Sequence, residues 1–222
     1  MIKILVSGEG KTDMGELNYP YNDPANLKKG PMTYLAEKII KQATDKTHHI
    51  ELVAKKTLSE KAKSNRKMKL PGKKSPKKTA YFYKNAYILG KIALEKHEDI
   101  AILFRDTDGT QSSSLSNWKE RAKSIYNGFK DSGFQNGVAM LPKPTSEAWI
   151  LCCIQKYQNC EKLEKLSGNE SSSKHPKKVF EQITNYTPTT ENLVKIACDI
   201  NQINMPSFNA FKASLEEVIT RI

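Results

Sequence analysis

The chain has few of the residue types that build zinc modules or disulfide-rich scaffolds. It has four cysteines and four histidines among 222 residues. The cysteines form no CxxC pair, and the histidines do not stand at zinc-ligand spacing from them. We therefore expect reduced, partly buried thiols, as in a cytosolic protein.

Long apolar runs are also missing. No apolar segment approaches the roughly 20 residues that a membrane helix needs. The N-terminal sequence MIKILVSGEG begins with a strand pattern and has no signal-peptide architecture. We expect a cytoplasmic protein that does not engage a membrane.

Acidic residues are outnumbered, with 24 Asp and Glu against 36 Lys and Arg and a formal net charge of +12. Most of the excess lies in residues 55–78, a Lys-rich loop in our interpretation, where eleven basic residues face Glu60 alone. Such a segment either is simply solvated or binds a polyanion such as DNA or RNA through counterion release. The lysines expected to contact nucleic acid are Lys11, Lys67, Lys69, Lys73, Lys74, Lys77 and Lys78.

Short apolar runs alternate with amphipathic segments through residues 1–160. Strands are expected at 2–6, 50–54, 100–104 and 137–141. Helices are expected at 31–43, 79–96, 118–129 and 146–157. This alternation predicts an α/β domain with a mostly parallel sheet flanked by helices. Residues 161–222 are expected to form a helical C-terminal extension, with helices at 177–184, 190–200 and 207–222.

Carboxylates follow two of the predicted strands. Glu9 comes three residues after Val6, and Asp106 comes two residues after Phe104, with Asp108 close behind. Because the carboxyl ends of parallel strands meet at one edge of a sheet, these side chains should converge. Converging carboxylates repel one another unless a cation neutralises them, which favours Mg²⁺ or Mn²⁺. Helix capping is the alternative for the two aspartates.

These motifs resemble the Toprim family. The first predicted strand runs into EGKTD, residues 9–13, and a later one ends in DTD, residues 106–108. The resemblance covers about residues 1–160 and implies that Asp106 and Asp108 hold Mg²⁺. It also implies acid or base chemistry for Glu9 near the metal, and Glu9 is itself a candidate metal ligand. Asp13 is a further candidate ligand.

A second motif resembles small Toprim-like proteins of bacterial defence, which are related to the Toprim domains of OLD-type nucleases. It consists of PTSEAW, residues 144–149, and a later PSF, residues 206–208. Glu147 follows the fourth predicted strand, so it is either another metal ligand or a first-turn residue favoured by the helix dipole. The resemblance implies a Mg²⁺-dependent nuclease acting on DNA or RNA in antiphage defence. It also allows a protein partner such as an ATPase.

Two other functions remain open. DTDGT, residues 106–110, matches the DxDxT motif of haloacid dehalogenase-like phosphatases, in which Asp106 would be the nucleophile. Against this, two predicted strands precede the motif, which normally follows the first strand of that fold. The other alternative is a nucleic-acid-binding or scaffold protein whose Toprim-like core is not catalytic.

Overall fold

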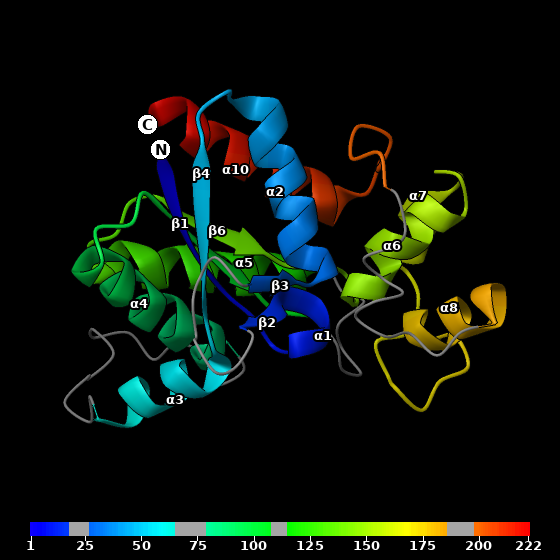
Figure 1. Cartoon of the computed structure of the whole chain (residues 1–222). Coiled ribbons are helices and arrows are strands. Elements are labelled where there is room, and N and C mark those ends of the chain that lie inside the picture. The colour runs from blue at the N-terminus through cyan, green and yellow to red at the C-terminus, as the bar shows by residue number, and fades with distance from the viewer. Residues whose placement is uncertain (18–26, 65–78, 108–114, 186–197) are drawn as a thin grey trace.

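A four-stranded sheet forms the centre of the computed structural model, which describes residues 1–17, 27–64, 79–107, 115–185 and 198–222 (Figure 1). The strands are β1 (Ile2–Ser7), β4 (His48–Val53), β5 (Ile100–Phe104) and β6 (Gly137–Met140). They lie in the order β4-β1-β5-β6, and each neighbouring pair is parallel. The prediction of an α/β fold with a mostly parallel sheet is confirmed.

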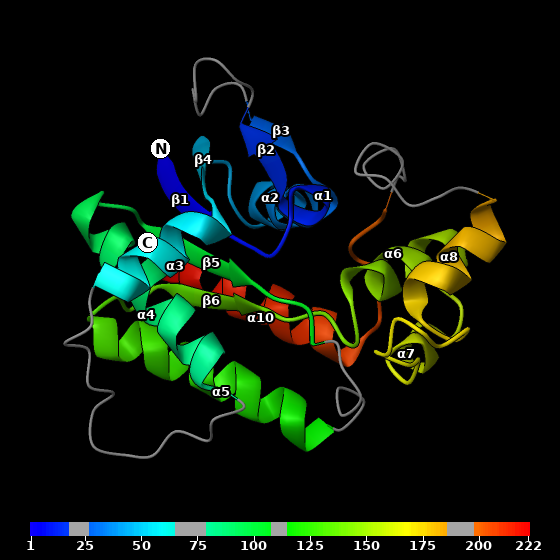
Figure 2. The ribbon, with the colours of Figure 1, turned by 90° about the horizontal axis from the view of Figure 1, so that it is seen from below.

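Alternate residues of each strand face opposite layers of helices, as the two-residue period of a strand requires. Ile4 and Val6 of β1 belong to a core cluster with one group of helices, whereas Leu5 belongs to the cluster on the other face. The first group contains α2 (Pro31–Ala43), α6 (Ser146–Ile154) and α10 (Pro206–Arg221). The second contains α3 (Lys55–Ser64), α4 (Ala80–Glu95) and α5 (Leu115–Ser132). Figure 2 shows α4 and α5 side by side, across the sheet from α2.

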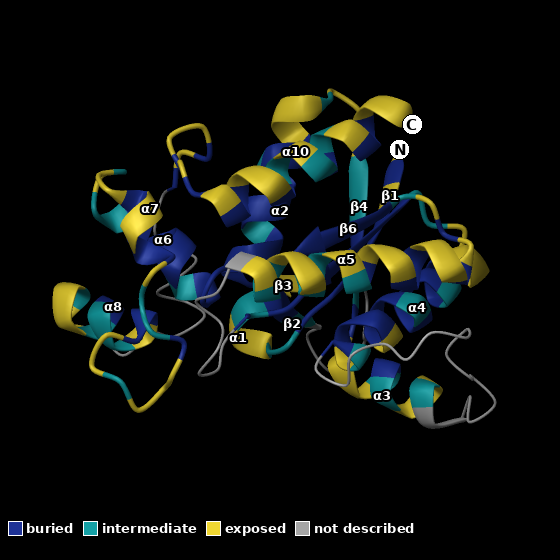
Figure 3. Cartoon of the chain, turned by 180° about the vertical axis from the view of Figure 1, so that it is seen from behind, coloured by how far each residue is buried: buried dark blue, intermediate teal, exposed yellow. Residues whose placement is uncertain are grey.

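The helix α10 fixes the position of α6. Phe208, Phe211 and Leu215 of α10 are buried at helical spacing, while its outward face is exposed (Figure 3). The Trp149 ring of α6 stacks on Phe211 with centroids 5.9 Å apart and meets Phe208 edge-on at 5.1 Å. Its indole N–H also donates to the Ser207 hydroxyl at 2.8 Å. The start of α6 is therefore held by a large aromatic anchor.

Several elements differ from the sequence prediction. Residues 55–64 form α3 rather than a loop, because the fully buried Leu58 anchors this basic segment in the core beside α4. The short elements that were not predicted are α1 (Lys11–Met14), β2 (Gly15–Leu17), β3 (Leu27–Lys29) and α7 (Cys160–Leu163). The helix predicted at 177–184 is α8 (Pro176–Thr184). Most of the one predicted at 190–200 lies outside the described residues, as does the part of the Lys-rich segment from 65 to 78.

Taken over the described ranges, no helix has both the length and the apolar character needed to cross a membrane.

The prediction of reduced thiols is wrong for this structure. Cys152 is bonded to Cys160, and Cys153 is bonded to Cys198, so α6 is linked to α7 and to the segment that precedes α10. The second pair is 45 residues apart in sequence, which explains why no local spacing pattern revealed it. Because disulfides are rare in cytosolic proteins, this pairing weighs against the predicted cytoplasmic location.

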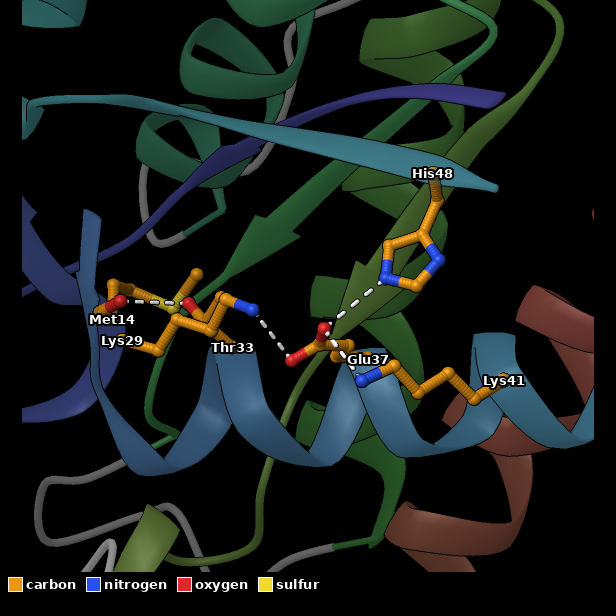
Figure 4. A network of polar contacts seen from close by, with 6 residues as sticks. All are labelled: Met14, Lys29, Thr33, Glu37, Lys41 and His48. Carbon is orange, nitrogen blue, oxygen red and sulfur yellow. Dashed lines mark hydrogen bonds and ion pairs between the residues drawn. The ribbon is translucent and has the colours of Figure 1, made fainter. Parts of the chain in front are cut away.

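A polar network around Glu37 fastens α2 to the strands beside it (Figure 4). The Glu37 carboxylate accepts from Lys29 of β3 at 2.7 Å, and it lies 3.0 Å from Lys41 Nζ and 3.2 Å from His48 Nε2. Burial alone would raise the pKa of Glu37, but the hydrogen bonds from these three groups outweigh it and lower the pKa from 4.5 to about 2. The network therefore stabilises an ionised carboxylate inside the protein.

One turn before Glu37, Thr33 connects α2 to the loop that follows β1. Its buried hydroxyl donates to the Met14 carbonyl oxygen at 2.7 Å, also seen in Figure 4. Glycine at position 15 makes this junction possible, since its φ of +97° is strained for other residues and a Cβ there would collide with the backbone of β3. The hydrogen bond from Thr33 to Met14 thus holds the end of α1 against α2.

Candidate functional site

Three loops meet at the carboxyl edge of the sheet. They follow β1, β5 and β6, and the last of them leads through the cis peptide bond before Pro144 into α6. Gly8 allows the β1 loop to pack closely on the end of β5, since a Cβ at this position would lie only 2.8 Å from the Phe104 ring. Parallel strands in open α/β sheets present their ligand sites at this edge.

Ser146, the first residue of α6, connects carboxylates from two of these loops. Its backbone N–H donates to Asp106 Oδ1 at 2.8 Å, and its hydroxyl donates to Asp13 Oδ1 at 2.6 Å. Ser146 itself is fully buried. One residue therefore holds together two predicted site residues that are 93 positions apart in sequence.

Glu147 and Glu9 complete the acidic group. The Thr145 hydroxyl donates to Glu147 Oε2 at 2.6 Å, and Glu9 Oε1 lies 3.7 Å from Arg105 Nε. The charges of both glutamates raise the pKa values of the two aspartates. The structure thus brings together Glu9, Asp13, Asp106 and Glu147, whereas Asp108 lies outside the described residues.

Ionising both aspartates at once is energetically unfavourable. Burial raises the pKa of Asp106 well above its usual value, and the charges of Asp13, Glu147 and Glu9 raise it further. Burial also raises the pKa of Asp13, from 3.8 to about 6, against the opposing hydrogen bond from Ser146. A bound cation would remove this repulsion and favour the ionised forms.

Arg105 is a site residue that the sequence interpretation missed. Its side chain is fully buried, donates to the Phe104 carbonyl oxygen at 2.8 Å and lies 5.4 Å from the centre of the Tyr81 ring. Burial lowers the pKa of its guanidinium group. Its only signal in the sequence was its position directly between an apolar strand and the DTD motif. In the structure, Arg105 supplies positive charge beside Glu9.

The carboxylate oxygens of this group are the kind of ligand that Mg²⁺ prefers. Within the described part of the chain, no three or more His, Cys, Asp or Glu side chains are arranged to hold a metal ion. Mg²⁺ is usually bound by only one or two carboxylates, with water and substrate phosphate filling the remaining positions. The Asp13–Asp106 pair, joined through Ser146, fits that requirement.

The predicted nucleic-acid contacts are only partly described. Lys11 begins α1, has an 81% exposed side chain and pairs with Glu16 at 2.9 Å. It lines a cavity of about 660 Å³ together with Glu9, Lys55, Lys61 and Lys96. The remaining predicted contacts, Lys67, Lys69, Lys73, Lys74, Lys77 and Lys78, lie outside the described residues.

The substitution Ser146→Ala should raise the pKa of Asp13 above about 6, because the serine hydroxyl donates to its carboxylate and lowers that pKa. At pH 8, where Asp13 is ionised, the loss should cost about 2 kcal/mol of folding free energy. Below pH 4 the carboxyl is protonated and the cost should shrink. Carbon-13 NMR titration of the aspartate carboxyls, with urea unfolding at pH 4 and 8, measures both effects. An unchanged Asp13 pKa would contradict the assigned hydrogen bond.

Comparison of the chain with protein-family models, with curated proteins and with solved structures gives no match. Its function must therefore be inferred from the residues of the site.

Proposed function

We propose that this protein is a Toprim-like, Mg²⁺- or Mn²⁺-dependent nuclease that hydrolyses phosphodiester bonds of DNA or RNA. The observation that carries the proposal is the junction at Ser146, which joins Asp13 and Asp106 at the carboxyl edge of a parallel sheet. Burial and the neighbouring carboxylates raise the pKa values of both aspartates, so a nearby cation would favour their ionised forms. A divalent cation such as Mg²⁺ has the charge and the preference for oxygen ligands that this requires.

In this mechanism Asp106 and Asp13 would hold a metal ion, with Asp108 and Glu147 as further ligands. A divalent ion held there would supply polarisation of the scissile phosphate and a water of lowered pKa. Glu9 accepts the proton of the attacking water, and Arg105, 3.7 Å away, orients its carboxylate. Ser146 keeps the two aspartates in place.

The basic surroundings support a nucleic-acid substrate. Four lysines line the cavity of about 660 Å³ against Glu9, Glu16 and Glu51, and the whole chain carries a formal charge of +12. Positive charge beside a phosphate-handling edge attracts a polyanion and raises its local concentration. The proposal also includes the predicted contacts from Lys67 to Lys78, which lie outside the described residues.

The resemblance of the EGKTD, DTD and EAW motifs to Toprim-like proteins also supports a setting in bacterial genome defence, with a partner such as an ATPase. A cytoplasmic location belongs to the same proposal. It requires that the disulfides Cys152–Cys160 and Cys153–Cys198 be kept in a compartment where disulfides are rare.

The proposal is tested by incubating the full chain with labelled single-stranded DNA, double-stranded DNA and RNA in the presence of Mg²⁺, Mn²⁺ or EDTA. We expect cleavage only with a divalent metal. The variant Glu9→Gln should cleave at least a hundredfold more slowly, since it loses the proton acceptor. The control Glu16→Gln changes a half-exposed glutamate of the same cavity and should cleave normally.

Cleavage in EDTA, or cleavage unaffected by Glu9→Gln, would overturn the assigned site. Binding of nucleic acid without cleavage of any substrate would favour the non-catalytic scaffold. A covalent phosphoenzyme on Asp106 would favour the phosphatase alternative instead.

A further inference from the structure

His175 occupies an unusual position beside the acidic group, although the sequence pattern gave it no role. It stands directly before α8, and only 5% of it is exposed. Its Nδ1 accepts a hydrogen bond from the Lys177 backbone N–H at 3.2 Å, so the imidazole caps the helix. An accepting Nδ1 places the proton of the neutral ring on Nε2. The ring therefore has a donor at its other nitrogen.

That donor has no hydrogen-bond partner among the residues the structure describes. A buried N–H without a partner costs about 1–3 kcal/mol, and such groups are rare in native proteins unless a ligand satisfies them. The unpaired Nε2–H is thus an indication of a binding site.

His175 lines a cavity of about 380 Å³ that two members of the acidic group, Asp106 and Glu147, also line. Asp106, Thr145 and Glu147 contribute from the β5 loop and from the start of α6. Figures 1 and 2 show α6 and α8 gathered at the same end of the molecule. The α8 side of the cavity contributes Lys177 and Lys178, and the remaining lining residues are Glu170 and Glu181.

The two sources of this lining differ in chemistry. The β5 loop and α6 provide carboxylates that attract a metal ion, whereas α8 and its cap provide the Nε2–H and two lysines beside the carboxylate of Glu181. N–H donors and lysines favour anions. A phosphate group satisfies both, because some of its oxygens can meet the metal and others the donors.

Direct metal binding by His175 is disfavoured by the same geometry. A metal ligand must present an unprotonated nitrogen, but the cap at Lys177 already uses that nitrogen and leaves the proton on Nε2. A hydrogen-bond acceptor is the partner that this tautomer requires.

We propose that His175 Nε2–H donates to a non-bridging oxygen of the substrate phosphate, and that Lys177 and Lys178 form the rest of this phosphate subsite. The inference rests on the nuclease function proposed above and assigns its substrate-binding side. The ligand is a nucleic-acid phosphodiester, for which inorganic phosphate is a competing source of the same chemistry.

The variant His175→Asn separates the two roles of the ring. Asparagine is a strong helix cap, so its side-chain oxygen can still accept from the Lys177 N–H, while the donor at the Nε2 position disappears. We expect an unchanged melting temperature and about a hundredfold loss of metal-dependent cleavage. The variant His175→Gln places an amide N–H near the Nε2 position and should recover part of the rate.

The matched control is His97→Asn. His97 is exposed and has a φ of 54°, a conformation that asparagine tolerates. This variant should cleave like the unmodified protein. If His175→Asn also cleaves at the normal rate while Glu9→Gln does not, the subsite is overturned and the nuclease proposal stands.

Nitrogen-15 NMR of the histidine-labelled full chain gives a readout that needs no cleavage, with His175→Asn assigning the signal. We expect the Nε2–H tautomer and a shift of its Nε2 signal when a phosphorothioate dinucleotide is added with Mg²⁺. The Nδ1–H tautomer, no shift with the dinucleotide, or a shift with inorganic phosphate alone would each overturn the proposal. A shift with the dinucleotide in a protein that cleaves nothing would support the subsite and reject the nuclease.

Discussion

Asp106→Asn is expected to lower metal-dependent cleavage about a thousandfold and, at the same time, to raise the melting temperature at pH 8. Asparagine keeps an oxygen that can accept from the Ser146 N–H but removes a charge needed for metal. Activity falls because the metal loses a ligand. Stability rises because the wild-type carboxyl is buried among other carboxylates.

The sign of the stability effect follows from the raised pKa of Asp106. Between the unfolded pKa, near 3.8, and the higher folded pKa, the native state binds a proton that the unfolded state has lost. Wild-type stability therefore falls as the pH rises through this window, and the asparagine variant avoids that loss. Its advantage should vanish below the unfolded pKa.

Melting curves at pH 4, 6 and 8, with and without Mg²⁺, measure this effect. Mg²⁺ should stabilise the unmodified protein more than the variant, since a ligand stabilises only the state that binds it. The exposed Asp45→Asn is the matched control and should change neither property. A variant that is less stable at pH 8, or that cleaves normally, would contradict the role assigned to Asp106.

Glu37→Gln is expected to lower the free energy of unfolding by about 3 kcal/mol at pH 7. Glutamine keeps the shape of the side chain but loses the charge that Lys29, Lys41 and His48 surround. Because the folded pKa is depressed from 4.5 to about 2, this stabilisation is fully present above pH 4.5. It is lost as the pH falls toward 2.

Urea unfolding at pH 7, 4 and 3 should show the difference between the two proteins shrinking with acidity. Glu60→Gln provides the control, since Glu60 is 61% exposed and pairs with Lys56 one helical turn away at 3.8 Å. Such surface pairs contribute about 0.5 kcal/mol or less. An equal loss for both variants, or a loss that is as large at pH 3 as at pH 7, would show that the Glu37 network is not electrostatic in origin.

Local sequence patterns predicted the framework of the protein well. The strand at 100–104 and the helix at 31–43 have the predicted bounds, because each is a continuous apolar or amphipathic segment with its own terminating residues. The meeting of Glu9 and Asp106 at one edge followed from the alternation of strands and helices alone. These features depend on short-range periodicity and on the parallel connection rule.

The contacts that assemble the site could not be predicted in the same way. Ser146 contacts Asp13, which is 133 positions away in sequence. His175 lines the cavity beside Asp106 because of where α8 packs beside α6. A serine or a histidine at such a position has no periodic signature. The helix at 55–64 was missed because it has a single strong apolar anchor, Leu58, among many lysines.

The aromatic anchor of α6 has a consequence for protein synthesis. Trp149 is packed by Phe208 and Phe211, so the helix that carries Ser146 lacks its support until residues some sixty positions further along have left the ribosome. A nascent or prematurely terminated chain that stops before α10 therefore exposes an unpacked tryptophan. Its acidic edge lacks the support of α10, so the carboxylate carried by α6 takes its final position only after α10 has been made.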